Sequence, residues 1–168
     1  MNIVAVCGSV QRTSSNRALL EELAHRAEPP TTVVVTDPID ALPHFNPDIT
    51  EPPPAVEAFR ALLATADAAV IATPEYAHNL PGVLKNALDW IVGTGDLYAT
   101  PVAVLCASPR DGGGAKARAS LEQTLQAIGA VVVDSRTVQI HQSRDRGDEL
   151  GSKRVQGELT EVLARLQA

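Results

Sequence analysis

The sequence has few aromatic residues and few cysteines, and it has no long apolar run. One Trp, two Tyr and two Phe make up 3% of its 168 residues, so the core must be built from aliphatic side chains. Two cysteines are too few for a framework of disulfide bonds. No apolar run approaches the roughly 18 residues that a membrane span requires. The N-terminal residues Met1–Val4 carry no basic side chain, so we expect no signal peptide.

The chain also lacks a strong excess of charge of either sign. It has 14 basic and 20 acidic residues, which gives a net charge of −6. A mildly acidic surface repels a phosphate backbone, so we expect no binding to nucleic acid. We therefore expect a cytoplasmic protein that does not bind membranes. Its length is that of about one domain, so residues 1–168 are expected to form a single domain.

Five short apolar runs alternate with segments of helical period. The runs are continuously apolar, which is typical of strands covered on both faces. They are Ile3–Cys7, Thr32–Thr36, Ala68–Thr73, Val102–Ala107 and Ala130–Val133. Between them, apolar residues recur at the spacing of one helix face, as at Leu84, Ala87, Leu88 and Ile91. This alternation predicts an α/β fold of three layers, a doubly wound parallel sheet of five strands with helices on both faces.

One connection is unusually long and rich in proline. Residues 29–54 hold eight of the twelve prolines, and residues 37–53 show no clear period. A stretch of that length in a compact domain is normally functional or part of an interface. The alternative is a rigid wrap over the sheet, and the sequence leaves both open.

The loop after the first strand is the first candidate site, because ligands of open α/β sheets bind beyond the carboxyl ends of the strands. Residues 8–16 read Gly-Ser-Val-Gln-Arg-Thr-Ser-Ser-Asn and lead into a predicted helix. Four hydroxyls, two side-chain amides and a guanidinium near a helix N-terminus favour a phosphate group. The alternative is that Ser14, Ser15 or Asn16 only caps the helix.

The glycine motifs of other phosphate-binding loops are absent. The loop has neither the P-loop pattern nor the dinucleotide pattern Gly-x-Gly-x-x-Gly. A low-molecular-weight tyrosine phosphatase would place five residues between its cysteine nucleophile and an arginine. Only four residues separate Cys7 from Arg12, so the loop is one residue short for that alternative.

Three segments resemble the motifs of the NAD(P)H-dependent FMN reductase family. The first segment is Gly8-Ser9 followed by Ser14 and Asn16, and the third is the glycine-rich segment 108–115. The second and longest is residues 74–90, which read Pro-Glu-Tyr-Ala-His-Asn-Leu-Pro-Gly-Val-Leu-Lys-Asn-Ala-Leu-Asp-Trp. The resemblance covers nearly the whole chain. It implies a flavodoxin-like fold with strand order 2-1-3-4-5, bound FMN, and NADPH or NADH as electron donor. It also implies reduction of a quinone, a flavin, an azo dye or a metal oxyanion.

The resemblance places the cofactor in three loops. The residues implied are Ser9, Gln11, Arg12, Ser14, Ser15 and Asn16 at the phosphate, Pro74, Glu75, Tyr76, Ala77, His78 and Asn79 at the ring edge, and Ser108, Arg110, Gly112 and Gly113 in the third loop. Two positions depart from the family pattern. Gln11 stands where the family has Arg. The negative phosphate therefore keeps a positive countercharge only if the Arg12 side chain reaches the loop. Ala77 stands where the family usually has Asn, so one side-chain contact is lost.

The resemblance also implies a mechanism and an assembly. FMN carries the chemistry, so we expect no catalytic side chain. No histidines or cysteines have the spacing of metal ligands, so we expect no metal site. We expect a ping-pong cycle at an open flavin face, because only Tyr76 and Tyr98 remain as aromatic neighbours of the ring. The helix Pro81–Trp90 is expected to join the chains of a homodimer or homotetramer. A flavodoxin-type electron carrier and a relative that has lost FMN are the alternatives.

The two cysteines lie at the ends of the first and fourth predicted strands. In the order 2-1-3-4-5 one strand separates them, so Cys7 and Cys106 are expected to be roughly 10 Å apart. That distance is too long for a disulfide bond. We expect both to be small buried side chains.

Overall fold

The computed structural model of the chain describes residues 1–140 and 149–168, in which strands and helices alternate. The strands are β1 (Asn2–Cys7), β2 (Thr32–Val35), β3 (Ala68–Ala72), β4 (Pro101–Ser108) and β5 (Val131–Gln139). The helices are α1 (Ser15–Arg26), the short 3-10 helix η1 (Ile39–Ala41), α2 (Pro54–Leu63), α3 (Gly82–Asp89), α4 (Ala115–Ala127) and α6 (Lys153–Leu166). Within this described part of the chain, no helix is long and apolar enough to cross a membrane.

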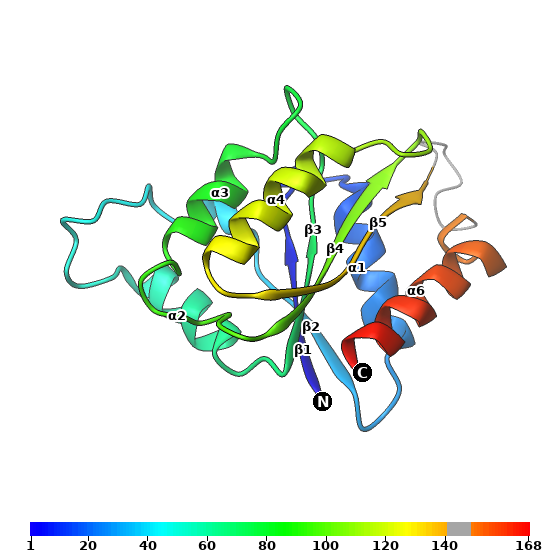
Figure 1. Cartoon of the computed structure of the whole chain (residues 1–168), viewed down its shortest axis with the longest axis horizontal. Coiled ribbons are helices and arrows are strands. Elements are labelled where there is room, and N and C mark those ends of the chain that lie inside the picture. Colours follow the sequence, from blue (N-terminus) through cyan, green and yellow to red (C-terminus); the bar gives the residue numbers. More distant parts are fainter. Residues whose placement is uncertain (141–148) are drawn as a thin grey trace.

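The sheet has five strands in the order β2-β1-β3-β4-β5, and every neighbouring pair is parallel. Helices α1 and α6 pack on one face, while α2, α3 and α4 pack on the other (Figure 1). The flavodoxin-like fold of three layers is thereby confirmed. The chain runs from β1 outward to β2 and then returns to β3 on the other side of β1, so the strand order reverses between β1 and β3. In such sheets the ligand site lies at the carboxyl ends of those two strands.

The core is aliphatic, as the composition predicts. Every residue of Ile3–Cys7 and of β3 is at most 1% exposed, because both strands have helices on both faces. Phe59 and Trp90 are the only aromatic side chains among the buried residues that the structure describes. Continuous apolar runs therefore identify the central strands correctly.

The expected end of the fifth strand is wrong. The apolar run stops at Val133, but β5 continues to Gln139 and pairs with β4 along its whole length. The polar residues of this edge strand have partners: Arg136 forms ion pairs with Asp134 at 2.5 Å and with Glu161 at 2.8 Å. An edge strand covered less completely than β1 can keep polar side chains, so its sequence loses the apolar signal.

The long proline-rich connection is attached near its middle to helix α3 and to Trp90, which follows this helix. We call residues 37–53 the arm; it contains η1 and extends beyond α2 and α3 at the left of Figure 1. The carbonyl of Pro43 accepts hydrogen bonds from Asn86 Nδ2 at 2.9 Å and Trp90 Nε1 at 2.8 Å. The Phe45 ring meets Trp90 edge to face, with centroids 5.2 Å apart. Two side chains of the expected interface segment Pro81–Trp90, Asn86 and Trp90, therefore form hydrogen bonds within this chain.

Candidate functional site

The loop after β1 presents a helix N-terminus at the carboxyl edge of the sheet. Ser14 caps α1, since its Oγ accepts a hydrogen bond from Arg17 N at 3.3 Å. The backbone N–H groups of Ser15 and Asn16 lie in the first turn of the helix, where no preceding carbonyl can accept them. Such groups, together with the positive end of the helix dipole, favour an anion.

A glycine allows this loop to pack against helix α3. Gly8 is buried, and a Cβ built on it would lie 2.8 Å from Leu84 Cδ2. Its N–H donates to Ala72 O at 2.8 Å, which joins the ends of β1 and β3. The loops after these two strands therefore begin side by side.

A cleft of about 230 Å³ lies where the loops after β1, β3 and β4 meet. It is lined by Ser9, Gln11, Ser14, Ser15, Asn16, Pro74, Glu75, Tyr76, Cys106, Ala107, Ser108, Pro109 and Gly114. Nine of the sixteen candidate site residues are thus brought together. The other seven do not line it: Arg12, Ala77, His78, Asn79, Arg110, Gly112 and Gly113. Gln11 rather than Arg12 faces the cleft, and Arg12 is exposed.

Asn16 has a structural partner that the sequence does not reveal. Its Oδ1 accepts a hydrogen bond from Ala107 N at 2.9 Å, and the residue is 4% exposed. This bond joins the first turn of α1 to the end of β4 across 91 residues of sequence. Asn16 therefore holds two walls of the cleft together, and its amide N–H₂ group can still donate.

Glu75 connects the second loop to the N-terminus of α4. Its Oε2 accepts hydrogen bonds from Lys116 N at 3.0 Å and Ala117 N at 3.2 Å. Its Oε1 lies 3.3 Å from His78 Nδ1. The bond from the Ala117 N–H is the main cause that lowers the pKa of the Glu75 carboxyl below its ordinary value. The carboxylate thus caps α4 and fixes the loop that follows β3.

Replacing Glu75 with glutamine is expected to remove part of the pH dependence of stability. Because the pKa of Glu75 is lowered in the folded state, its stabilising contribution is complete above the ordinary pKa of about 4.3 and is lost as the pH falls through the lower folded value. We expect Glu75→Gln to lower Tm at pH 7 by about 1–3 °C. The difference from the parent protein should shrink at pH 3 in thermal unfolding, and a difference that stays constant with pH would contradict this role.

The tip of the second loop is a tight turn with strained backbone. Tyr76 and Asn79 exchange two backbone hydrogen bonds, each 3.0 Å long. The residues between them have positive φ, +48° at Ala77 and +64° at His78. This is the pattern of a type I′ turn, which favours Asn and Gly at its central positions. The backbone conformation therefore explains why the family has asparagine at the position of Ala77, since asparagine tolerates the left-handed conformation.

Replacing Ala77 with asparagine is expected to stabilise the protein. The substitution relieves the cost of a left-handed alanine, which is about 1 kcal/mol. We expect Tm to rise by about 2–4 °C, while Ala77→Val should lower it because a branched Cβ adds strain at positive φ. Thermal unfolding followed by circular dichroism measures both changes. Equal Tm values for the two variants would show that the turn is not strained.

The third loop brings its backbone close to the end of β4. Gly114 has a φ of +79°, and a Cβ built on it would overlap Cys106 Sγ and lie 2.9 Å from Cys106 Cβ. Thr137 Oγ1 donates to the carbonyl of Gly113 at 2.7 Å, which fixes the loop from β5. Ser108 Oγ accepts from Arg110 N at 3.2 Å, so this side chain shapes the loop as well as lining the cleft.

The aromatic surroundings of the cleft differ from the sequence-based expectation. Tyr76 lines the cleft and is 54% exposed. The expectation that Tyr98 neighbours the same site is wrong. Tyr98 comes before β4, at the opposite edge of the sheet, where its Cδ2 atom would lie 2.6 Å from a Cβ built on Gly129. Tyr76 is therefore the single aromatic side chain in the cleft as described.

Both cysteines are free and buried. Cys106 lines the cleft but is 2% exposed, and burial raises the pKa of its thiol to about 11. Burial also raises the pKa of the Cys7 thiol.

The sequence model of one protein family, described as NADPH-dependent FMN reductase, matches residues 1–145. The chain belongs to this family. It is therefore an oxidoreductase of the NAD(P)H-dependent FMN reductase and quinone reductase type, with FMN as cofactor and NAD(P)H as electron donor.

Relatives with assigned names agree with this family. An NAD(P)H-dependent FMN reductase of Pseudomonas aeruginosa, PA1204, is 34% identical over 155 residues, covering 90% of this chain and 83% of the relative. A quinone reductase of Escherichia coli K12 is 32% identical over 139 residues, covering 80% of this chain and 74% of the relative. Among solved structures, the flavoenzyme NAD(P)H:(acceptor) oxidoreductase FerB of Paracoccus denitrificans superposes with a TM-score of 0.81 at 27% identity, covering 99% of this chain and 97% of FerB.

Proposed function

We propose that this family member holds FMN in the cleft and passes electrons from NAD(P)H to a quinone in a ping-pong cycle. The observation that carries the proposal is the cleft itself, in which a free helix N-terminus and two further loops meet at the point where strand order reverses. Relatives named as quinone reductases support a quinone as the acceptor.

The chemistry of the cleft fits FMN. The hydroxyls of Ser9, Ser14 and Ser15 and the N-terminal N–H groups of α1 lie on one side of it and suit a phosphate dianion. Gly114 lies in the opposite wall, where the backbone is too close to Cys106 for any side chain. A flat ring can approach such a backbone closely.

We assign the roles of the residues accordingly. Ser9, Ser14, Ser15 and Asn16 bind the phosphate. Pro74, Glu75 and Tyr76 lie at the polar edge of the ring, to which the backbone N–H of Glu75 donates, while Ser108 and the glycine-rich loop close the far side. Bound FMN would supply the redox chemistry, which is hydride transfer from the nicotinamide and two-electron transfer to the acceptor. The protein's own contribution is to bind, orient and expose the ring. Backbone N–H groups directed at the ring edge stabilise negative charge that develops there.

The ping-pong order follows from an open ring face. With Tyr76 as the single aromatic side chain in the described cleft, no pair of aromatic rings encloses the flavin. NAD(P)H and the quinone can then use the same face in turn. A flavodoxin-type carrier, by contrast, would exchange electrons with a protein partner and would not oxidise NAD(P)H alone.

Two measurements test this function. Addition of FMN to the purified protein should quench the flavin fluorescence and raise Tm as the FMN concentration increases. Steady-state oxidation of NADPH with benzoquinone should give parallel double-reciprocal lines. A protein indifferent to FMN would rule out the proposal, slow NAD(P)H oxidation by the loaded protein would favour the carrier, and intersecting lines would exclude the ping-pong order.

We also propose that the chain, as one domain, forms a homodimer or homotetramer in the cytoplasm. The turn that follows helix α3 and the arm beside the helix carry exposed apolar side chains, since Val92 is 57% and Phe45 41% exposed. Two unpaired buried thiols are consistent with a reducing compartment. Sedimentation equilibrium of the protein and of Val92→Asp tests the assembly, which should dissociate in the variant.

A further inference from the structure

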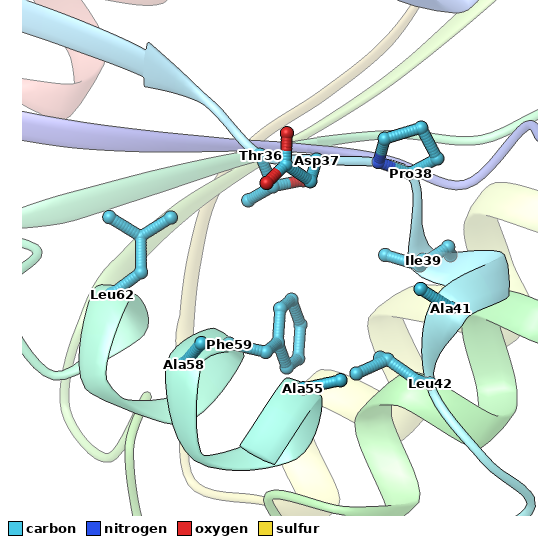
Figure 2. A pocket seen from close by; sticks show the side chains of 10 residues that line it. All are labelled: Thr36, Asp37, Pro38, Ile39, Ala41, Leu42, Ala55, Ala58, Phe59 and Leu62. Carbon is cyan, nitrogen blue, oxygen red and sulfur yellow. The ribbon is translucent and has the colours of Figure 1, made fainter.

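A second cavity lies beyond the end of β2 and shares no lining residue with the cleft. It has a volume of about 180 Å³ and lies between the end of the strand, η1 and helix α2 (Figure 2). Its lining residues are Thr36, Asp37, Pro38, Ile39, Ala41, Leu42, Ala55, Ala58, Phe59 and Leu62.

Most of the wall is apolar. In Figure 2 the α2 side chains Ala55, Ala58, Phe59 and Leu62 form one side, and the side chains of η1 lie across from them. Two of these α2 residues are alanines, which leave space that a larger side chain would fill. An apolar cavity of about 150 Å³ is large enough to bind benzene, so this cavity matches a single six-membered ring with a short substituent.

One end of the cavity is polar and carries a hydroxyl group without a hydrogen-bond partner among the described residues. Thr36 is 4% exposed, and its Oγ1 has no hydrogen-bond partner in the described part of the chain. The backbone of Thr36 is fixed, because its N–H donates to Ala5 O at 2.9 Å and its carbonyl accepts from Arg17 at 3.2 Å. A buried hydroxyl left without a hydrogen bond destabilises the folded protein. A ligand that hydrogen-bonds to Thr36 Oγ1 would remove this destabilisation.

The negative charge at this end of the cavity favours a cationic ligand. Figure 2 places the Asp37 carboxylate beside Thr36, and none of the lining residues is basic. Asp40, also exposed, adds a second negative charge nearby in the chain. The basic group that contacts this end is Arg17, whose guanidinium donates to the Thr36 carbonyl from α1, on the other face of the sheet.

We propose that this cavity binds a small aromatic amine, a single ring that carries an ammonium group on a short alkyl chain. The ring packs against Phe59 and Leu62, and the ammonium group donates to Thr36 Oγ1 and to the carboxylate of Asp37. This proposal does not depend on FMN binding, because the two sites share no residue.

Benzylamine is a direct probe of the site. In ¹H–¹⁵N NMR titrations of the FMN-saturated protein and of protein without added FMN, we expect benzylamine to shift the amide signals of residues 36–42 and 55–62. Benzyl alcohol should bind about tenfold more weakly and benzoate more weakly still, because each loses the attraction to Asp37. Equal affinity for benzoate and benzylamine, or shifts outside these segments, would overturn the proposal.

Variants separate the parts of the site. Ala58→Leu should fill the cavity and abolish the shifts, while Ala61→Leu, on the same helix but outside the cavity, should leave them unchanged. Asp37→Asn should remove the preference for benzylamine over benzyl alcohol. Thr36→Val should weaken benzylamine about tenfold and raise Tm, because it removes the unpaired hydroxyl. Unchanged binding in Ala58→Leu would contradict the site, whatever the outcome of FMN titrations.

Discussion

Replacing Gly114 with alanine is expected to abolish FMN binding and to lower the free energy of unfolding by about 2–4 kcal/mol. Two causes act together. The new Cβ would overlap Cys106 Sγ, and alanine would have to adopt the φ of +79° that glycine holds at no steric cost. The loop can relieve the overlap only by moving away from β4, and Gly114 and Cys106 both line the cleft.

Two further variants make this expectation specific. Gly157→Ala, in helix α6 where a Cβ meets no atom within 4 Å, should raise stability by about 0.5–1 kcal/mol and leave FMN affinity unchanged. The double variant Cys106→Ala with Gly114→Ala removes the overlap with sulfur and should recover part of the lost stability. Denaturant unfolding and FMN titration measure both properties. Full FMN affinity in Gly114→Ala would show that the third loop does not contact the cofactor.

Replacing Asn16 with aspartate is expected to weaken FMN binding about 100-fold, or about 2.7 kcal/mol, with little loss of stability. Aspartate keeps the oxygen that accepts from Ala107 N, so the link between α1 and β4 remains. The new carboxylate, however, places a negative charge at the position proposed for the phosphate, and it replaces an N–H₂ donor.

The matched variant Asn16→Leu is expected to lose stability, whereas Asn16→Asp largely keeps it. It removes the acceptor for the Ala107 N–H and should cost about 1–3 kcal/mol of folding free energy. Comparing FMN and riboflavin separates the two effects, because riboflavin has no phosphate. Asn16→Asp should weaken FMN much more than riboflavin, and an equal loss for both ligands would contradict a phosphate contact at Asn16.

The strands were predictable where burial is complete. The apolar runs place the limits of β1, β3 and β4 within one residue, because helices on both faces require apolar side chains at every position. The end of β5 was not predictable, since its residues beyond Val133 are polar and are held by partners such as Glu161 in α6. The arm gave no periodic signal, and its attachment through the Pro43 carbonyl involves no side chain of its own.

The candidate site was predictable as three loops but not in its internal contacts. Hydroxyls next to a helix start, as at Ser14, indicate an anion site because the helix N-terminus is a local feature. The bonds that Ala107 N donates to Asn16 and Lys116 N donates to Glu75 join residues that are 91 and 41 positions apart, so no local pattern reveals them. The strain at Ala77 had one signal, the family asparagine at that position.

The burial of Cys106 has a consequence for the durability of the protein under oxidative stress. A thiol whose pKa is about 11 is ionised on the order of one molecule in a few thousand at pH 7.5, and the thiolate is the form that peroxide attacks. With FMN bound in the cleft as proposed, peroxide formed when a reduced flavin passes electrons to oxygen would arise near this sulfur, because Cys106 lines the cleft. A protonated, 2% exposed thiol reacts slowly with peroxide, so we expect this wall of the cleft to remain intact during turnover in air.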